Sequence, residues 1–209
     1  MKVIVFGATG QVGKLAVRRM LKQGHEVSAF VRVPAALGFD DPNLRLVAGD
    51  ALNEETAADA IKGHDAVVVT LGSGLSRKSL IRSQGTMNVI RGMHRHGVRR
   101  LICQSTLGAH ESWGNLNFFW KRIMFGLLLR PVFLDHELQE KLVRASGLDW
   151  TIVRPGAFTD GPATGRFKEA FRPSERNLSL KISRADIADF LNRQLSDNRY
   201  LGHAVGISN

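Results

Sequence analysis

Residues 3–13 read Val3-Ile4-Val5-Phe6-Gly7-Ala8-Thr9-Gly10-Gln11-Val12-Gly13 and decide the fold of this chain. The first four residues are apolar and mostly β-branched, which is typical of a short strand covered on both faces. Three glycines follow in a G-x-x-G-x-x-G pattern. Apolar residues then recur at helical spacing from Leu15 to Leu21, until Gly24. The pattern therefore predicts a strand, a tight turn and a helix in direct succession.

The rest of the first half repeats this alternation of strand and helix. An alternating order favours the α/β class, a doubly wound parallel sheet with helices on both faces, and 209 residues suit a single domain of this kind. Further strands are expected at Glu26–Val31, Leu44–Ala48, Asp65–Leu71, Arg100–Ser105 and Asp149–Arg154, with a weak one at Ala204–Ile207. Helices are expected after a cap at Asn53 and over Ser79–Gly97, Leu134–Ser146 and Ser183–Leu195.

The rhythm breaks after residue 106, where we expect a substrate-covering insertion over about residues 107–133. It contains the apolar stretch Phe118–Leu129, which Pro131 is expected to terminate. A second irregular segment, rich in proline and glycine, is expected over about residues 156–175. The Phe118–Leu129 stretch contains Lys121 and Arg122 and falls well short of the ~20 residues that cross a bilayer, so we expect no membrane partner.

Charge and cysteine content narrow the possible environments of the chain. The sequence has 29 Lys and Arg against 19 Asp and Glu, a net charge of +10 that would attract polyanions. The densest basic cluster, residues 91–100, has no interleaved aromatic side chains for base stacking, so nucleic acid is not the expected partner.

Cys103 is the only cysteine, which excludes an internal disulfide and suits a cytoplasmic protein; we expect it to be an inert core residue.

The glycine turn has the residue types that bind a dinucleotide. Glycines let the backbone approach a pyrophosphate closely, and the following helix offers unpaired N–H groups and a partial positive charge. The position directly after the first strand makes the pattern specific, because that is the context in which such turns bind phosphate. The expected contacts are Gly7, Thr9, Gly10, Gln11, Val12 and Gly13.

The end of the second predicted strand indicates which dinucleotide is bound. A site for NAD commonly has an Asp or Glu there, whereas this chain continues with Arg32, whose guanidinium suits a 2′-phosphate. The cofactor is therefore predicted to be NADP(H), unless Arg32 only faces solvent. Asp50, at the end of the third strand, is expected with Ala51 near the adenine; capping of the next helix is an equal alternative for Asp50.

Several motifs together resemble the atypical short-chain dehydrogenase/reductases, and within them the flavin reductase/biliverdin-IXβ reductase group and its NmrA-like relatives. The resemblance covers nearly the whole chain. Its motifs are GATGQVG (7–13), VR (31–32), VAGD (47–50), DAVVVTLGSG (65–74), HGVRRLICQST (96–106), DHELQEKLVRASGLDWTIVRPG (135–156) and GPATG (161–165). It implies a Rossmann fold and a nicotinamide lying near Leu71, Gly72, Ser73, Ser105, Thr106, Pro155 and Gly156.

The tyrosine and lysine pair of the usual short-chain dehydrogenases is missing. The sole tyrosine is Tyr200, near the carboxyl end, and the corresponding helix offers His136 instead. We therefore expect NADPH-dependent transfer of hydride to a planar acceptor that needs no tightly placed phenol, such as a flavin, a linear tetrapyrrole or a quinone. Ser105 and Thr106 would orient the cofactor or acceptor, and His136, which ordinarily titrates near neutral pH, would donate a proton or hold an acidic substrate.

Alternatives stay open from the sequence. Ser105 and Thr106 could merely close a strand, and His136 could be a surface residue. The protein could be a non-catalytic NADP(H)-binding redox sensor of the NmrA-like type, or its basic surface could bind nucleic acid. We expect no metal ligands and a monomer or weak homodimer.

Overall fold

The computed structural model describes residues 1–74, 76 and 80–209 and contains ten strands. Eight of them form one sheet: β1 (Lys2–Phe6), β2 (Glu26–Val31), β3 (Leu44–Ala48), β4 (Ala66–Val69), β5 (Arg100–Gln104), β6 (Asp149–Pro155), β8 (Lys168–Glu169) and β10 (His203–Ser208). The helices are α1 (Gln11–Lys22), α2 (Glu54–Ile61), α3 (Ile81–His96), α4 (Arg130–Ala145) and α5 (Arg184–Arg193). Two short 3₁₀ segments, η1 (Pro34–Ala36) and η2 (His110–Asn115), and a π-helix, η3 (Phe119–Leu128), complete the list of helical elements.

The strand order in the sheet is β3-β2-β1-β4-β5-β6-β10-β8, and every neighbouring pair except β10 and β8 is parallel. The predicted α/β class and doubly wound parallel sheet are confirmed. The order reverses between β1 and β4, and in such sheets the crevice at the carboxyl ends of the two strands is the usual ligand site.

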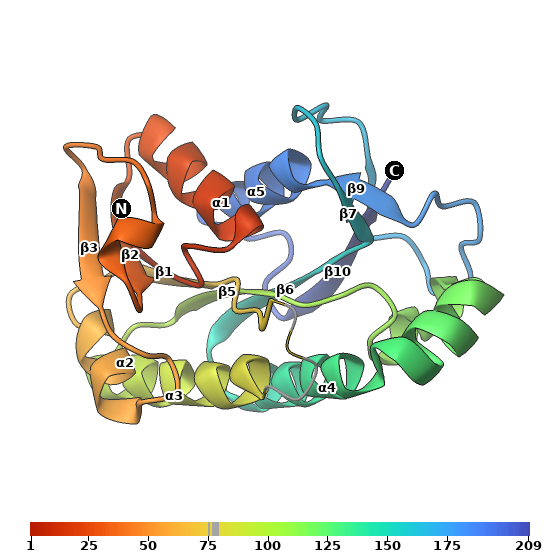
Figure 1. Ribbon diagram of the computed structural model, residues 1–209, viewed down its shortest axis with the longest axis horizontal. Helices are drawn as coiled ribbons and strands as arrows, with labels where there is room; N and C mark the ends of the chain where they lie inside the picture. The colour runs from red at the N-terminus through yellow and green to blue at the C-terminus, as the bar shows by residue number, and fades with distance from the viewer. Residues whose placement is uncertain (75, 77–79) are drawn as a thin grey trace.

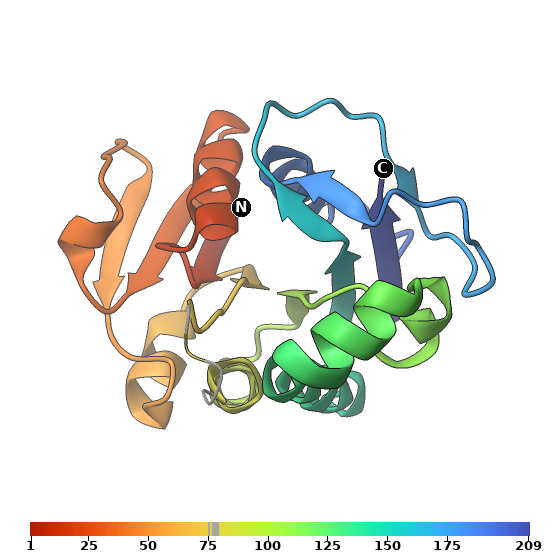
Figure 2. The same ribbon diagram turned by 45° about the vertical axis from the view of Figure 1, so that its right-hand side comes forward.

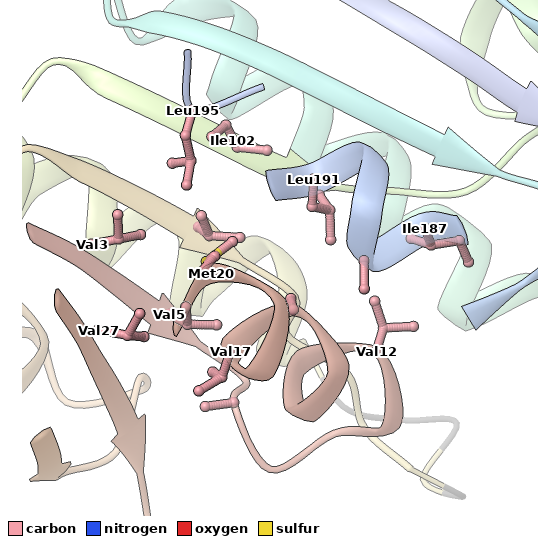
Figure 3. Packing of buried hydrophobic residues seen from close by; sticks show 14 of the residues in the cluster. Val3, Val5, Val12, Val17, Met20, Val27, Ile102, Ile187, Leu191 and Leu195 are labelled. Carbon is pink, nitrogen blue, oxygen red and sulfur yellow. The ribbon is translucent and has the colours of Figure 1, made fainter. Parts of the chain in front are cut away.

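Helices cover both faces of this sheet (Figure 1). The pair α1 and α5 lies on one face, and α2, α3 and α4 lie on the other, as the second view also shows (Figure 2). The side chains of each strand alternate between two cores. Val5 and Ile102 pack with α1 and α5, whereas Ile4 and Cys103 pack on the α2–α4 side. Figure 3 shows Val12, Val17 and Met20 of α1 between the strands and α5.

The second half of the chain differs from the sequence prediction in two places. Helix α4 begins at Arg130, not Leu134, and Pro131 lies in its first turn, where the missing N–H costs nothing. The segment after β6 holds β7 (Ala157–Thr159), which pairs with β9 (Lys181–Ser183), as well as the edge strand β8, antiparallel to β10. Helix α3 was expected from Ser79, which lies outside the described residues; it begins at Ile81. No helix in the described ranges has the length and hydropathy of a membrane span.

Candidate cofactor and acceptor site

The turn between β1 and α1 is closed so tightly that two of its glycines have no room for a side chain. A Cβ atom on Gly7, whose φ is +86°, would lie 2.5 Å from the carbonyl oxygen of Thr70. A Cβ atom on Gly13 would lie 2.2 Å from the carbonyl oxygen of Gly7. The Gly10 N–H donates to the Gly7 carbonyl at 3.0 Å and closes the turn. The glycine pattern is therefore required by the close approach of α1 to the ends of β1 and β4.

The amino end of α1 presents main-chain N–H groups to a ligand. Its N-cap is Gly10, no side chain of the described residues caps it, and its first turn carries no acidic residue. Thr9, Gly10 and Gln11 are exposed, whereas the Val12 side chain is buried in the core, so Val12 can offer a ligand only its backbone. Exposed amides, the helix dipole and the absence of a carboxylate together suit a pyrophosphate.

The adjacent loops contain the residues expected around the adenosine half of a dinucleotide. Arg32 follows β2 and is exposed, and the structure gives it no ion pair or hydrogen bond within the described ranges. Asp50 is also exposed, and its carboxylate accepts from the Leu52 N–H at 3.0 Å. The cap of α2 is Asn53, which accepts from the Thr56 N–H, so the capping alternative for Asp50 is wrong. Ala51 is buried and its carbonyl accepts from Asn88.

A buried arginine that the sequence does not single out lies beside the end of β4. Arg82, in the first turn of α3, donates to the Ser73 hydroxyl at 3.1 Å. It lies 3.7 Å from the Asp135 carboxylate of α4, which also accepts from the N–H groups of Arg82 and Ser83. Asp135 therefore caps α3 from another helix. Gly72 lies against the same guanidinium, so Leu71, Gly72 and Ser73 are held close to a positive charge.

Two of the three predicted catalytic residues, Ser105 and His136, carry buried polar atoms without partners. Ser105 is 1% exposed, and its hydroxyl has no hydrogen-bond partner among the described residues. His136 is half-buried, and its Nδ1 is likewise unpartnered there. Thr106 is half-buried, and its hydroxyl donates a long hydrogen bond, 3.4 Å, to the Leu107 carbonyl. The Ser105 hydroxyl and the His136 Nδ1 are therefore free to hydrogen-bond a polar ligand or a water at this edge of the sheet.

The expectation that His136 titrates near neutral pH is wrong. Burial and the neighbouring Arg82 charge lower the pKa of His136 to about 3, and the nearby Gln139 side chain opposes this shift only in part. Its ring is therefore neutral at physiological pH and can donate one hydrogen bond and accept another.

An apolar cavity of about 250 Å³ lies next to these residues. Its polar wall contains Thr106 and His136, and its floor contains Pro155 and Gly156 at the end of β6. The remaining lining comes from the segments after β5 and β6: Leu107, Leu116, Trp120, Phe125, Leu129, Val132, Ala157, Phe158 and Leu180. The structure thus brings together Thr106, His136 and Pro155 from three separate elements. Phe125 of this lining stacks on Phe133, with the ring centroids 4.7 Å apart.

A buried ion network holds these elements in place and was not predicted. Arg154 of β6 is 1% exposed and donates to both oxygens of Glu140 of α4, at 2.8 and 2.5 Å. It also pairs with Glu111 of η2 at 3.0 Å, and Arg144 pairs with the same Glu111 at 2.9 Å. Glu140 therefore contacts Arg154 instead of the His136 one turn away. The network ties the segment covering the cavity to the sheet.

Two other sequence features lie away from this site. In the basic cluster, Arg91 and Arg95 pair with Glu54 and Glu55, and Arg99 pairs with Asp149. These pairs leave less free charge for a polyanion than the sequence suggests. Tyr200 lies in the turn before β10, and its hydroxyl donates to Glu169 of β8 at 3.1 Å.

A family model for NAD(P)H-binding proteins matches residues 7–198. The chain therefore belongs to the NAD(P)H-binding family of atypical short-chain dehydrogenase/reductases. This membership defines an NAD(P)H-dependent oxidoreductase with a Rossmann-like fold.

Individual relatives span nearly the whole chain. A protein of Bacillus subtilis named an uncharacterized sugar epimerase, YhfK, is 33% identical over 198 residues, which is 90% of this chain and 85% of that protein. The anaerobilin reductase ChuY of Escherichia coli O157:H7 superimposes with a TM-score of 0.80 at 23% identity, over 99% of this chain and 96% of that one. A short-chain dehydrogenase/reductase of Veillonella parvula in complex with NADP gives a TM-score of 0.82 at 17% identity, over 100% and 94%.

Proposed function

We propose that this protein reduces a planar, largely apolar acceptor with NADPH, the acceptor class being a flavin, a linear tetrapyrrole or a quinone. The observation that carries the proposal is the apolar cavity lined by Thr106, His136 and Pro155, at the edge of the sheet where the glycine turn also lies. Pockets of this kind, apolar with a few polar anchors, suit flat conjugated ligands. The NADP bound to the Veillonella protein and the reductase activity named for ChuY support the same assignment.

The residues present fit NADP(H). The Gly7–Gly13 cradle and the uncapped amino end of α1 would hold the pyrophosphate, and Arg32 would pair with the 2′-phosphate. Asp50 and Ala51 would lie by the adenine. At the other end, Leu71, Gly72, Ser73 and Pro155 would line the nicotinamide, and the unpartnered Ser105 hydroxyl would bind its carboxamide. When bound, NADPH supplies the hydride.

The acceptor is positioned by groups of the chain itself. Neutral His136 and Thr106 would hydrogen-bond an oxygen or nitrogen of the acceptor, and the aromatic wall would hold its plane. The nearby Arg82 charge would stabilise negative charge that develops on the acceptor. Because conjugated acceptors delocalise this charge, the lack of a catalytic tyrosine is compatible with turnover. A sugar would leave its hydroxyls unpaired in so apolar a cavity, which argues against epimerase activity despite the name of the Bacillus relative.

The test is a screen of acceptors with purified protein, following loss of NADPH absorbance with FMN, biliverdin and a soluble quinone. We expect turnover with at least one of them. Ala157→Phe, which narrows the cavity, should raise KM for that acceptor at least tenfold and leave the Kd for NADPH unchanged. Ala145→Phe, the same change at an exposed residue at the carboxyl end of α4, is the matched control.

Two results would overturn the proposal. Tight NADPH binding without oxidation by any acceptor would favour the redox-sensor alternative. Turnover that Ala157→Phe leaves unaffected would mean that the acceptor binds elsewhere.

A further inference from the structure

An exposed apolar face lies on and beside η3. Eight of the fourteen exposed large apolar side chains in the described residues fall between residues 113 and 138. We call the part of this surface formed by Phe118, Phe119, Ile123, Leu127 and Leu128 the η3 face. Phe118 is 73% exposed and Leu127 70%. Isolated exposed hydrophobic residues are common on proteins, but a group on one short helix marks an interaction surface.

The helix that carries this face, drawn in green, lies at the right-hand end of the molecule in Figure 1 and in front of α4 in Figure 2. Its opposite side is occupied, because Trp120, Phe125 and Leu129 line the acceptor cavity. The outward apolar residues are therefore not needed to close that cavity.

The charge around the η3 face has one sign. Residues 112–134 contain no Asp or Glu but include Lys121, Arg122 and Arg130. The structure pairs none of these three cations with a carboxylate of the described ranges. They line a second hollow of about 550 Å³ with Trp113 and Phe133. Other arginines of the fold, such as Arg144 and Arg154, are paired with glutamates.

The η3 face is apolar and is bordered by cations without carboxylate partners in the described ranges, on a protein of net charge +10. A partner that fits it must therefore be both apolar and negatively charged. A second copy of this chain would bring the same three cations face to face across a two-fold axis, which is repulsive. An anionic lipid surface satisfies both features, because the apolar side chains enter the acyl boundary while Lys and Arg contact the headgroups.

The expectation of no membrane partner rested on the lack of a spanning segment alone. We propose that the η3 face docks this protein on the surface of an anionic lipid bilayer, without spanning it. Phe118, Phe119, Ile123, Leu127 and Leu128 enter the interface, and Lys121, Arg122 and Arg130 bind lipid phosphates. The docking does not depend on the proposed reductase activity.

The experiment is flotation of the full chain with vesicles. Vesicles of phosphatidylcholine and phosphatidylglycerol in equal parts should carry the protein, and vesicles of phosphatidylcholine alone should carry at least tenfold less. Raising the salt concentration should weaken the binding, because the headgroup contacts are screened. Equal binding to both compositions, or to neither, overturns the proposal.

Two double variants test the η3 face itself. Phe118→Ser with Leu127→Ser, and separately Arg122→Glu with Arg130→Glu, should each reduce binding to the anionic vesicles at least tenfold. Lys22→Glu with Lys62→Glu makes the same change of charge at the carboxyl ends of α1 and α2 and should bind nearly as well as the native chain.

NADPH affinity serves as the check of folding. If the variant with Phe118→Ser and Leu127→Ser no longer binds NADPH, the vesicle binding of the variant with Arg122→Glu and Arg130→Glu decides the test. The control variant at Lys22 and Lys62 could lose as much vesicle binding as the variant at Arg122 and Arg130. Binding would then depend on net charge alone and not on the η3 face, which would overturn the proposal. A dimer in gel filtration that the serine pair dissolves, with no vesicle binding, would show that the face binds a second copy instead.

Discussion

At the scale of single residues, the proposed preference for NADPH over NADH rests on one exposed side chain. Arg32 follows β2 and has no partner within the described ranges, so its guanidinium is available to a phosphate. Arg32→Asp removes this contact and places a carboxylate where a 2′-phosphate would lie. We expect the preference for NADPH over NADH to fall at least a hundredfold, which corresponds to about 2.8 kcal/mol.

The measurement is the Kd of each nucleotide by calorimetry for the native chain and the variant. Arg45→Asp, an equal change of charge on the exposed part of β3, is the control and should leave the ratio of the two Kd values within twofold. A ratio that Arg32→Asp does not alter would contradict the assignment of NADP(H).

The sequence predicts some residues of the candidate site and misses others for a physical reason. Gly7, Gly13 and Arg32 belong to one continuous strand-turn-helix-strand unit, so local spacing is enough to find them. Arg82 and Asp135 are 53 residues apart, and only the packing of α3 on α4 brings them together. The same packing buries His136, which explains why its expected titration was wrong: a sequence gives the residue type but not its solvation.

At the scale of elements, the stability of the packing of α4 on the sheet depends on its ion pair with β6. Glu140 is fully buried and accepts two hydrogen bonds from Arg154. Glu140→Gln leaves the buried Arg154 charge without its main counter-ion, so we expect the free energy of unfolding to fall by about 3–5 kcal/mol. Urea denaturation measures this, with Glu137→Gln on the same helix as the control. A loss below about 1 kcal/mol would show that Glu111 alone can compensate Arg154.

The limits of α4 show why element boundaries are harder to predict than elements. Its apolar pattern was recognised, but Pro131 was interpreted as the end of the preceding segment and not as part of the first turn of α4. Proline is compatible with both positions, and the sequence contains no sign that η3 and α4 are separated by Leu129 alone. The strands β7, β8 and β9 have two or three residues each, too few for a period to be visible.

At the scale of the whole molecule, the sheet order follows from the sequence more completely than the site does. Seven strands are expected from the sequence, and the first five belong to the alternating part of the chain, where right-handed crossovers leave few other strand orders. No comparable rule predicts where the segment after β5 that covers the cavity will lie. Its position depends on contacts among Glu111, Glu140 and Arg154, from three parts of the chain, which no local pattern encodes.

Stability of the whole fold should decrease steadily in acid, because at least two groups shift in the same direction. The folded chain keeps the pKa of His136 near 3, against 6.5 for a free histidine, so between these values the unfolded chain binds more protons and acid favours unfolding. Burial raises the pKa of Glu111, but hydrogen bonds from Arg154 and Arg144 outweigh this effect and lower it to about 2, so the same loss continues from pH 4.5 downward. His136 alone accounts for a slope of up to about 1.4 kcal/mol per pH unit.

Urea unfolding at a series of pH values should show that the free energy of unfolding falls below pH 6.5. In His136→Gln the slope of this free energy against pH should be smaller above pH 4.5. In the control His203→Gln, at an exposed residue, the slope should be unchanged. Equal slopes in the native chain and His136→Gln would mean that the imidazole of His136 reaches solvent in the folded protein and is not held neutral by burial.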